Sequence, residues 1–149
     1  DKRRAKERAL YLLTYRDHSY KELYQKLIKN YSDEICDEVC DKMEESGLID
    51  DRKYTEKISR EYIVGKKYGE YRARAEMRQK GLDKELIDEA LSEYEEDTEE
   101  RLSELVEKKY ARYLTDRKGV QKVKSALVRQ GYSYSDINVV LDDYIDEID

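Results

Sequence analysis

The sequence predicts an all-α protein built as a tandem array of three three-helix repeats. Three observations support this fold class: proline is absent from the 149 residues, apolar residues recur at helical spacing, and the pattern returns after about 50 residues. Apolar residues make up 38% of the chain and charged residues 44%, which suits helices that each bury one narrow stripe. We therefore expect nine helices, no sheet and an elongated outline.

The first fifty residues divide into three helices at residues that cap helix ends. The apolar faces of these helices are Ala5, Ala9, Leu12 and Leu13, then Leu23, Leu27 and Tyr31, and then Ile35, Val39 and Met43. Ser19 with Glu22 has the spacing of a capping box, and Ser32 is placed to open the third helix. Gly47 stands where a helix would stop.

The same landmarks return at a spacing of 50 residues and define the second and third repeats. From the first repeat to the second, the spacing takes Ala5 to Thr55, Ala9 to Ser59, Leu13 to Ile63, Ser19 to Gly69 and Leu27 to Met77. From the second to the third, it takes Gly69 to Gly119, Met77 to Leu127, Gly81 to Gly131, Ile87 to Ile137 and Leu91 to Leu141. Such a period is typical of a tandem array. We expect the repeats to cover residues 1–50, 51–96 and 97–149.

Charge divides each repeat in the same way. The first two helices of each repeat are basic, with net charges of +5, +6 and +7 over residues 1–31, 52–81 and 108–134. The third helices and their flanks are acidic, with −8, −10 and −6 over residues 32–51, 82–107 and 135–149. The charges could serve as solvated faces that attract neighbouring repeats. They could also form a positive ridge that follows a polyanion despite the net charge of −6.

The basic residues of the middle helices are the candidates for such a ridge, which we call the basic strip. Its members are Lys21, Lys26, Lys66, Lys67, Arg72, Arg74, Arg78, Arg117, Lys118, Lys122, Lys124 and Arg129. We expect Lys66, Lys67, Arg117 and Lys118 in the turns just before the second and third middle helices. The other members should lie on the exposed side of their helices, outside the apolar stripe.

Candidates for catalysis or metal binding are few. His18 is the only histidine, so a triad or histidine pair is excluded, and we expect it at the surface or as a cap. Cys36 and Cys40 lie one helical turn apart and are expected to pack as thiols, because a zinc site would need His18 and a carboxylate. Asp50 and Asp51 precede a helix, where an N-cap and a first-turn acid belong. We predict no enzymatic activity, no cofactor and no metal.

The chain has 15 tyrosines but neither phenylalanine nor tryptophan. Tyrosines on the apolar stripes, expected in the core, are Tyr62, Tyr94, Tyr110 and Tyr144. Tyrosines interleaved with basic residues are Tyr20, Tyr24, Tyr68 and Tyr71. The second group could stack on single-stranded bases or serve as amphipathic packing. A major-groove reader is disfavoured, since the third helix of every repeat is acidic.

Several motifs resemble the RecX family, in order along the chain. Arg4–Leu13 followed by Arg16–Leu27 resembles the opening of these proteins, with an Arg, then Ser, then Glu-Leu and Lys-Leu. Gly47–Tyr54 is similar to their junction of glycine, apolar residues, Asp-Asp and an aromatic residue. Lys80–Leu82 and Gln130–Ser133 match the glycines that end the later middle helices, whereas the first repeat has Asn30-Tyr31 there.

The resemblance implies a curved array and a regulatory role. RecX proteins modulate the RecA recombinase, so it implies binding to the RecA–single-stranded-DNA filament, with weak, sequence-independent contact to the DNA. The outcome would be modulation, mainly inhibition, of the ATPase, strand-exchange and coprotease activities in DNA repair, recombination and the SOS response. It further implies a cytoplasmic monomer with an additional segment before Asp1. The alternative is a helical protein-interaction scaffold without nucleic-acid contact. No apolar run reaches the ~20 residues of a membrane span.

Overall fold

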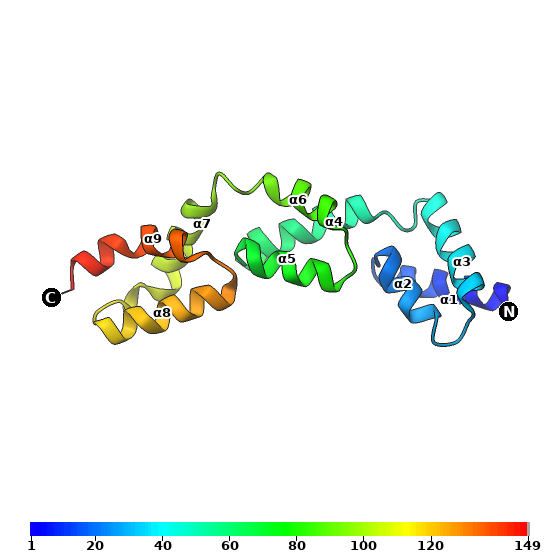
Figure 1. The fold of residues 1–149 in the computed structure, drawn as a ribbon, viewed down its shortest axis with the longest axis horizontal. Helices are drawn as coiled ribbons and strands as arrows, with labels where there is room; N and C mark the ends of the chain where they lie inside the picture. Colours follow the sequence, from blue (N-terminus) through cyan, green and yellow to red (C-terminus); the bar gives the residue numbers. More distant parts are fainter. Residues whose placement is uncertain (149) are drawn as a thin grey trace. The chain divides into compact units, whose positions relative to one another are not determined.

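The computed structural model describes residues 1–148, and this part of the chain has nine α-helices and no strand, as predicted (Figure 1). The helices are α1 (Lys2–Tyr15), α2 (Tyr20–Leu27), α3 (Asp33–Glu45), α4 (Asp51–Arg60), α5 (Glu70–Gln79), α6 (Lys84–Ser92), α7 (Thr98–Leu105), α8 (Arg117–Gln130) and α9 (Tyr134–Asp146). Within the same residues, no helix is long and apolar enough to cross a membrane.

The helices belong to two compact units. The first unit contains Asp1–Ile58 and Met77–Ile87, and in it α3 packs against α1 and α2. The apolar faces predicted for the first repeat meet in its core. The buried residues of that core are Ala5, Ala9, Leu12, Leu23, Leu27, Cys36, Val39, Cys40, Met43 and Ile49. The division between the units passes through α5, so each unit includes part of the second repeat.

The second unit contains Ser59–Glu76 and the described residues from Asp88 onward. In it α9 packs against α7 and α8. The buried residues of its core are Leu102, Leu105, Val106, Leu114, Val120, Val123, Leu127, Tyr132, Ile137 and Leu141. The +50 partners Leu127, Ile137 and Leu141 are therefore core residues, as the repeat pattern predicts.

The predicted caps are confirmed. The Ser19 hydroxyl accepts from the N–H of Glu22 at 3.0 Å, and the Glu22 carboxylate accepts from the N–H of Ser19 at 3.0 Å. Ser32 caps α3 through the N–H of Ile35. Gly47 has a positive φ of 81° directly after α3, so this helix ends where the glycine predicts.

Three irregular turns were not predicted. α4 continues into a π-helical turn, η1 (Glu61–Gly65), and α7 continues into a π-helical turn, η2 (Val106–Tyr110), and a 3₁₀ turn, η3 (Ala111–Tyr113). Because α8 begins at Arg117, the expectation that Arg117 and Lys118 lie before the helix was wrong: they form its first turn. Lys66 and Lys67 do lie in the turn before α5, as expected.

In the second unit, the start of α5 contacts the end of α8. The N–H of Gly69 donates to the Gln130 carbonyl at 2.8 Å, and the N–H of Tyr71 donates to the Gly131 carbonyl at 3.1 Å. A Cβ on Gly69 would lie 2.4 Å from the carbonyl carbon of Gly131, so only glycine permits this approach. The Tyr132 hydroxyl donates to the Lys67 carbonyl at 2.7 Å and closes the same junction.

The first unit contains a similar junction between the start of α2 and the turn after α5. The Ser19 hydroxyl, already the cap of α2, donates to the Lys80 carbonyl. A Cβ on Gly81 would lie 2.5 Å from the Cβ of Lys21. Because Ser19 and Gly69 occupy equivalent positions, as do Gly81 and Gly131, the recurrence of small residues reflects one type of junction that is formed in each unit.

Asp50 and Asp51 act as the sequence predicts and make one additional contact. The Asp50 carboxylate accepts from the N–H of Lys53 at 3.1 Å, as an N-cap of α4. Asp51, in the first turn of α4, accepts from the N–H of Tyr20 at 2.9 Å. This N–H lies at the start of α2 and has no acceptor within its own helix. Burial raises the pKa of Asp51, and the neighbouring Asp83 adds to the rise.

The contact between Asp51 and Tyr20 predicts different outcomes for two substitutions. Asp51→Ala leaves the N–H of Tyr20 without this acceptor and should lower the free energy of unfolding by about 1–2 kcal/mol. Asp51→Asn keeps an oxygen acceptor of the same size, so the change should stay within about 0.5 kcal/mol. Urea unfolding followed by circular dichroism measures both. Equal losses in the two variants would contradict the role given to the acceptor oxygen.

Candidate nucleic-acid interface

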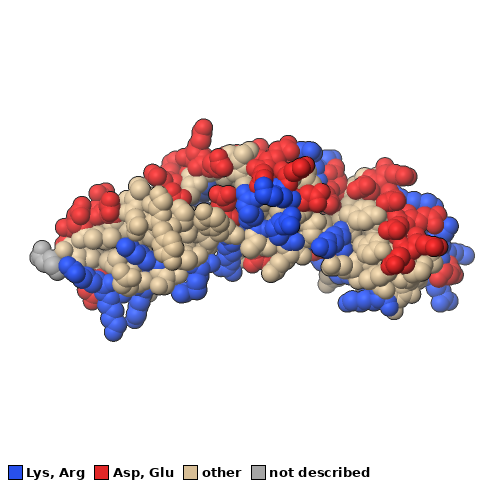
Figure 2. All heavy atoms as spheres, viewed as in Figure 1, with Lys and Arg blue, Asp and Glu red and all other residues tan. Residues whose placement is uncertain are grey.

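α8 contributes five members of the basic strip. Arg117, Lys118, Lys122 and Arg129 are exposed, and Lys124 is half-buried. In the third repeat, Lys and Arg side chains gather along the α8 edge, whereas Asp and Glu gather over the opposite edge in the same view (Figure 2). The apolar stripe of this helix, formed by Val120, Val123 and Leu127, is buried. The basic residues of α8 therefore lie mainly on its exposed side, as expected.

α5 does not follow this expectation, because two of its three arginines are half-buried and held by other residues. Arg72 donates to the Gln130 side chain at 2.8 Å, and its guanidinium lies 4.1 Å from the centre of the Tyr68 ring. Arg74 pairs with Glu70 at 3.0 Å and also with Asp88. These contacts within the second unit occupy both guanidinium groups. Arg78, the third arginine, is exposed.

Lys26 on α2 is also engaged: its Nζ lies 3.0 Å from His18 Nε2, and burial lowers its pKa. Lys66 is exposed but lies over the Tyr62 and Tyr68 rings. Among the remaining members, six are exposed and make no ion pair within residues 1–148. We call these six residues the open cations, and they are Lys21, Arg78, Arg117, Lys118, Lys122 and Arg129. Each of the three middle helices carries at least one of them.

The expectation that His18 lies at the surface was wrong, because this residue is only 2% exposed. Its Nδ1–H donates to the Arg16 carbonyl at 2.9 Å, and Nε2 accepts from Lys26 Nζ. Burial lowers the pKa of His18, and the charges of Arg16 and Lys26 lower it further. The folded chain therefore favours the neutral ring. The spacing of apolar residues in the sequence does not include His18, so it could not predict this burial.

A lowered pKa for His18 makes stability depend on pH. As pH falls below the ordinary histidine pKa of about 6.5, the unfolded chain takes up the proton first. The contribution of His18 is therefore complete above that pH and is lost as pH falls toward the folded-state pKa. We expect the wild-type chain to lose more unfolding free energy between about pH 7.5 and about pH 5.5 than His18→Gln. Equal losses in urea titrations would contradict this assignment.

The two cysteines pack as predicted. Cys36 and Cys40 are both buried in the core of the first unit. Burial raises the pKa of Cys40 to about 12, and Cys36 and Asp41 add to this rise. A thiol with such a pKa is a poor nucleophile and a poor metal ligand at neutral pH. Over residues 1–148, no three His, Cys, Asp or Glu side chains come together as a possible metal site.

The tyrosines interleaved with basic residues have different positions. The Tyr20 hydroxyl donates to Asp41 at 2.7 Å and the Tyr24 hydroxyl donates to Asp33 at 3.2 Å, while both rings pack against the first core. Tyr68 lies 5.4 Å from the Tyr62 ring and beside Arg72. Tyr71, by contrast, is 62% exposed. The packing interpretation therefore fits Tyr20, Tyr24 and Tyr68.

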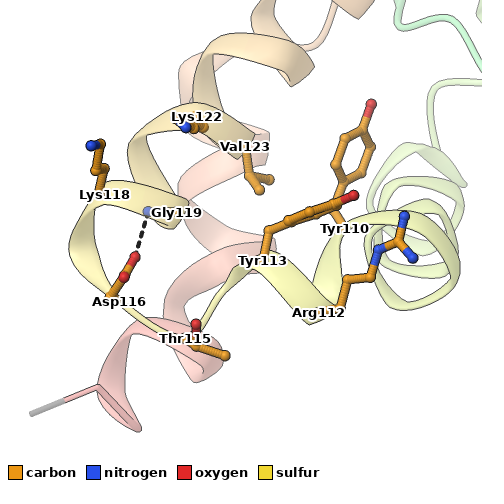
Figure 3. A pocket seen from close by; sticks show the side chains of 9 residues that line it. All are labelled: Tyr110, Arg112, Tyr113, Thr115, Asp116, Lys118, Gly119, Lys122 and Val123. Carbon is orange, nitrogen blue, oxygen red and sulfur yellow. Dashed lines mark hydrogen bonds between the residues drawn. The ribbon is translucent and has the colours of Figure 1, made fainter.

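The third repeat contains a groove that the sequence pattern does not predict. It lies between η3 and the start of α8, with Tyr110, Arg112 and Tyr113 on one side and Lys118 and Lys122 on the other (Figure 3). Tyr110 is half-buried and packs against the second core, as expected for a tyrosine on the apolar stripe, and it also lines this groove. The irregular turns η2 and η3 interrupt the helical spacing, so the periodicity could not place these side chains.

Comparison with known proteins identifies the family. Three RecX family models match in order: the first three-helix domain over residues 5–43, the second over 50–91 and the third over 95–141. The Regulatory protein RecX of Vibrio campbellii is 33% identical over 139 residues, which are 92% of this chain and 89% of that protein. The Regulatory protein RecX of Clostridioides difficile is 32% identical over 141 residues, 93% of this chain and 66% of that protein.

Solved structures agree with the sequence matches. The crystal structure of RecX from Lactobacillus salivarius superimposes with a TM-score of 0.84 at 26% identity, over 99% of this chain and 97% of that one. A second crystal structure, of regulatory protein RecX, gives a TM-score of 0.81 at 28% identity, over 95% of this chain and 71% of that one. With three domain models in order and relatives that match nearly its whole length, the chain belongs to the RecX family of regulatory proteins.

Proposed function

We propose that this chain binds the RecA–single-stranded-DNA filament and modulates it, mainly by inhibiting ATP hydrolysis, strand exchange and coprotease activity. Membership in a family of regulatory proteins supports a regulatory role. The observation that supports contact with a polyanion is the set of open cations, which includes residues of every middle helix. Because these side chains are not paired with carboxylates within the described residues, they can meet phosphates without first breaking an ion pair.

In this proposal the chain acts by occupying a surface and performs no chemistry. The open cations face phosphates, and each contact displaces counterions from the nucleic acid. The acidic third helices meet basic surface on the protein subunits of the filament. Many weak contacts along a repeat array give a strong total affinity. Once one repeat is bound, the others are held close to the filament at a high effective concentration. The chain acts in the cytoplasm as a monomer and needs no cofactor.

Two alternatives come from other functional classes. A protein-interaction scaffold would use the same charges only for solubility and for attraction between repeats. A hydrolase built on Asp50 and Asp51 is disfavoured, because Asp50 caps α4 and Asp51 accepts from the N–H of Tyr20. Both carboxylates therefore have structural roles.

The deciding experiment titrates the purified chain into RecA strand-exchange and ATPase assays on single-stranded DNA. We expect both rates to fall as the chain saturates the filament, and co-sedimentation should show the chain bound to it. If the chain neither binds the filament nor slows ATP turnover, the scaffold function takes the place of this proposal. Equal slowing of an unrelated DNA-dependent ATPase would indicate competition for DNA alone.

A further inference from the structure

The groove between η3 and α8 has a volume of about 490 Å³, within the size range of ligand-binding pockets. The Tyr113 and Tyr110 side chains lie near one another on one side of the groove, and the Val123 side chain points toward Tyr113 (Figure 3). Tyr113 is 49% exposed, so part of this residue is accessible to a ligand. Arg112 lies over the same residue, with its guanidinium carbon 4.8 Å from the ring centre.

The two elements that line the groove approach each other closely through their backbones. A Cβ on Gly119 would lie 1.8 Å from the Tyr113 carbonyl oxygen, so the first turn of α8 packs directly on the backbone of η3. The Asp116 carboxylate caps α8 by accepting from the N–H of Gly119 at 2.7 Å. These contacts join the backbone of η3, which carries Tyr113, to the first turn of α8, which carries Lys118.

The lining of the groove combines aromatic faces with positive charge. Arg112, Lys118 and Lys122 supply three cations, and the one carboxylate among the lining residues, Asp116, is used as the helix cap. Aromatic rings beside cations are the features that bind single-stranded nucleic acid, because unpaired bases stack on the rings and phosphates meet the cations. Paired bases cannot stack in this way, so the groove favours a single strand over a duplex.

We propose that this groove is a nucleotide subsite, in which an unpaired base stacks on Tyr113 while Lys118 and Lys122 contact the adjacent phosphates. The inference rests on the proposed function in taking nucleic acid as the partner. It goes further by placing direct contact with the strand in one groove of the third repeat and by assigning the contact to base stacking as well as charge.

The test measures binding of the full chain to a fluorescent oligothymidine by anisotropy. Tyr113→Ala should weaken binding about tenfold, since stacking on one ring contributes about 1–3 kcal/mol per base. Tyr113→Phe should bind as the wild type does. Tyr134→Ala is the matched control, because Tyr134 lies in the same unit, is 70% exposed and is outside the groove. Unfolding curves establish that the variants remain folded.

An abasic oligonucleotide of the same length tests stacking without changing the protein. It should bind the wild type more weakly than oligothymidine does, and Tyr113→Ala should remove this difference. The inference is overturned if Tyr113→Ala binds as tightly as the wild type, if the abasic strand binds equally well, or if a polyglutamate peptide displaces the oligonucleotide at equal charge concentration. RecA ATPase inhibition by the wild type is scored separately, so its absence contradicts the proposed function and not the groove.

Discussion

Gly131→Ala is expected to lower the free energy of unfolding of the second unit by about 2–4 kcal/mol, because it combines two costs. Gly131 has φ of 106°, a conformation that residues with a Cβ rarely adopt. A Cβ there would also lie 2.5 Å from the amide nitrogen of Arg72 and 2.6 Å from its Cβ. The start of α5 would have to move away from the end of α8. Urea unfolding followed by circular dichroism measures the loss.

Two other glycines separate these costs. Gly47 has a similar positive φ of 81° but no atom within 4 Å of its added Cβ, so Gly47→Ala should lose only the conformational part, about 1–2 kcal/mol. Gly65 has neither feature, and Gly65→Ala should change stability by less than about 0.5 kcal/mol. A loss for Gly131→Ala no larger than that for Gly47→Ala would show that the junction with Arg72 tolerates a methyl group.

The fold was predictable because its signals are local. Helical spacing, the capping box of Ser19 with Glu22 and the stop at Gly47 act within a few residues, and the structure contains all of them. The reason for the recurring small residues was not predictable. Gly69 and Gly131 meet across 62 positions of the chain, and a single sequence on its own gives no signal for such a contact. The π-helical turns after α4 and α7 were missed for the same reason, since no single residue marks them.

The candidate site was predicted less well than the fold. Spacing could place basic residues on a helix, but it could not show which of them already have partners. Arg72 and Arg74 are drawn into contacts with Gln130, Glu70 and Asp88, all of which depend on packing. A reversal of these two arginines would therefore disturb folding as well as binding. Residues suited to testing the basic strip have to be exposed and without such contacts.

Reversing one open cation in each middle helix should weaken binding to the RecA–single-stranded-DNA filament. Lys21, Arg78 and Arg129 are exposed, lie outside the groove of the third repeat and make no ion pair in the described part of the chain. If each meets a phosphate, the triple change to Glu should reduce the slope of log affinity against log salt by about 2, since each contact contributes about 0.7. Folding should be retained within about 0.5 kcal/mol per site, as exposed charges add little stability.

The matched control changes three exposed acids to lysine, one in or directly after the third helix of each repeat: Glu44, Glu93 and Asp143. It alters the net charge by the same amount in the opposite direction. If the basic strip meets the DNA, this variant should keep the salt slope of the wild type and lose no affinity for DNA. Filament binding should weaken only if the acids meet protein subunits. Binding to an oligonucleotide without RecA separates an effect on protein contacts from an effect on DNA contacts. Equal loss of oligonucleotide binding in both triple variants would contradict the strip. If phosphates are the partner, opposite changes of charge cannot weaken binding equally.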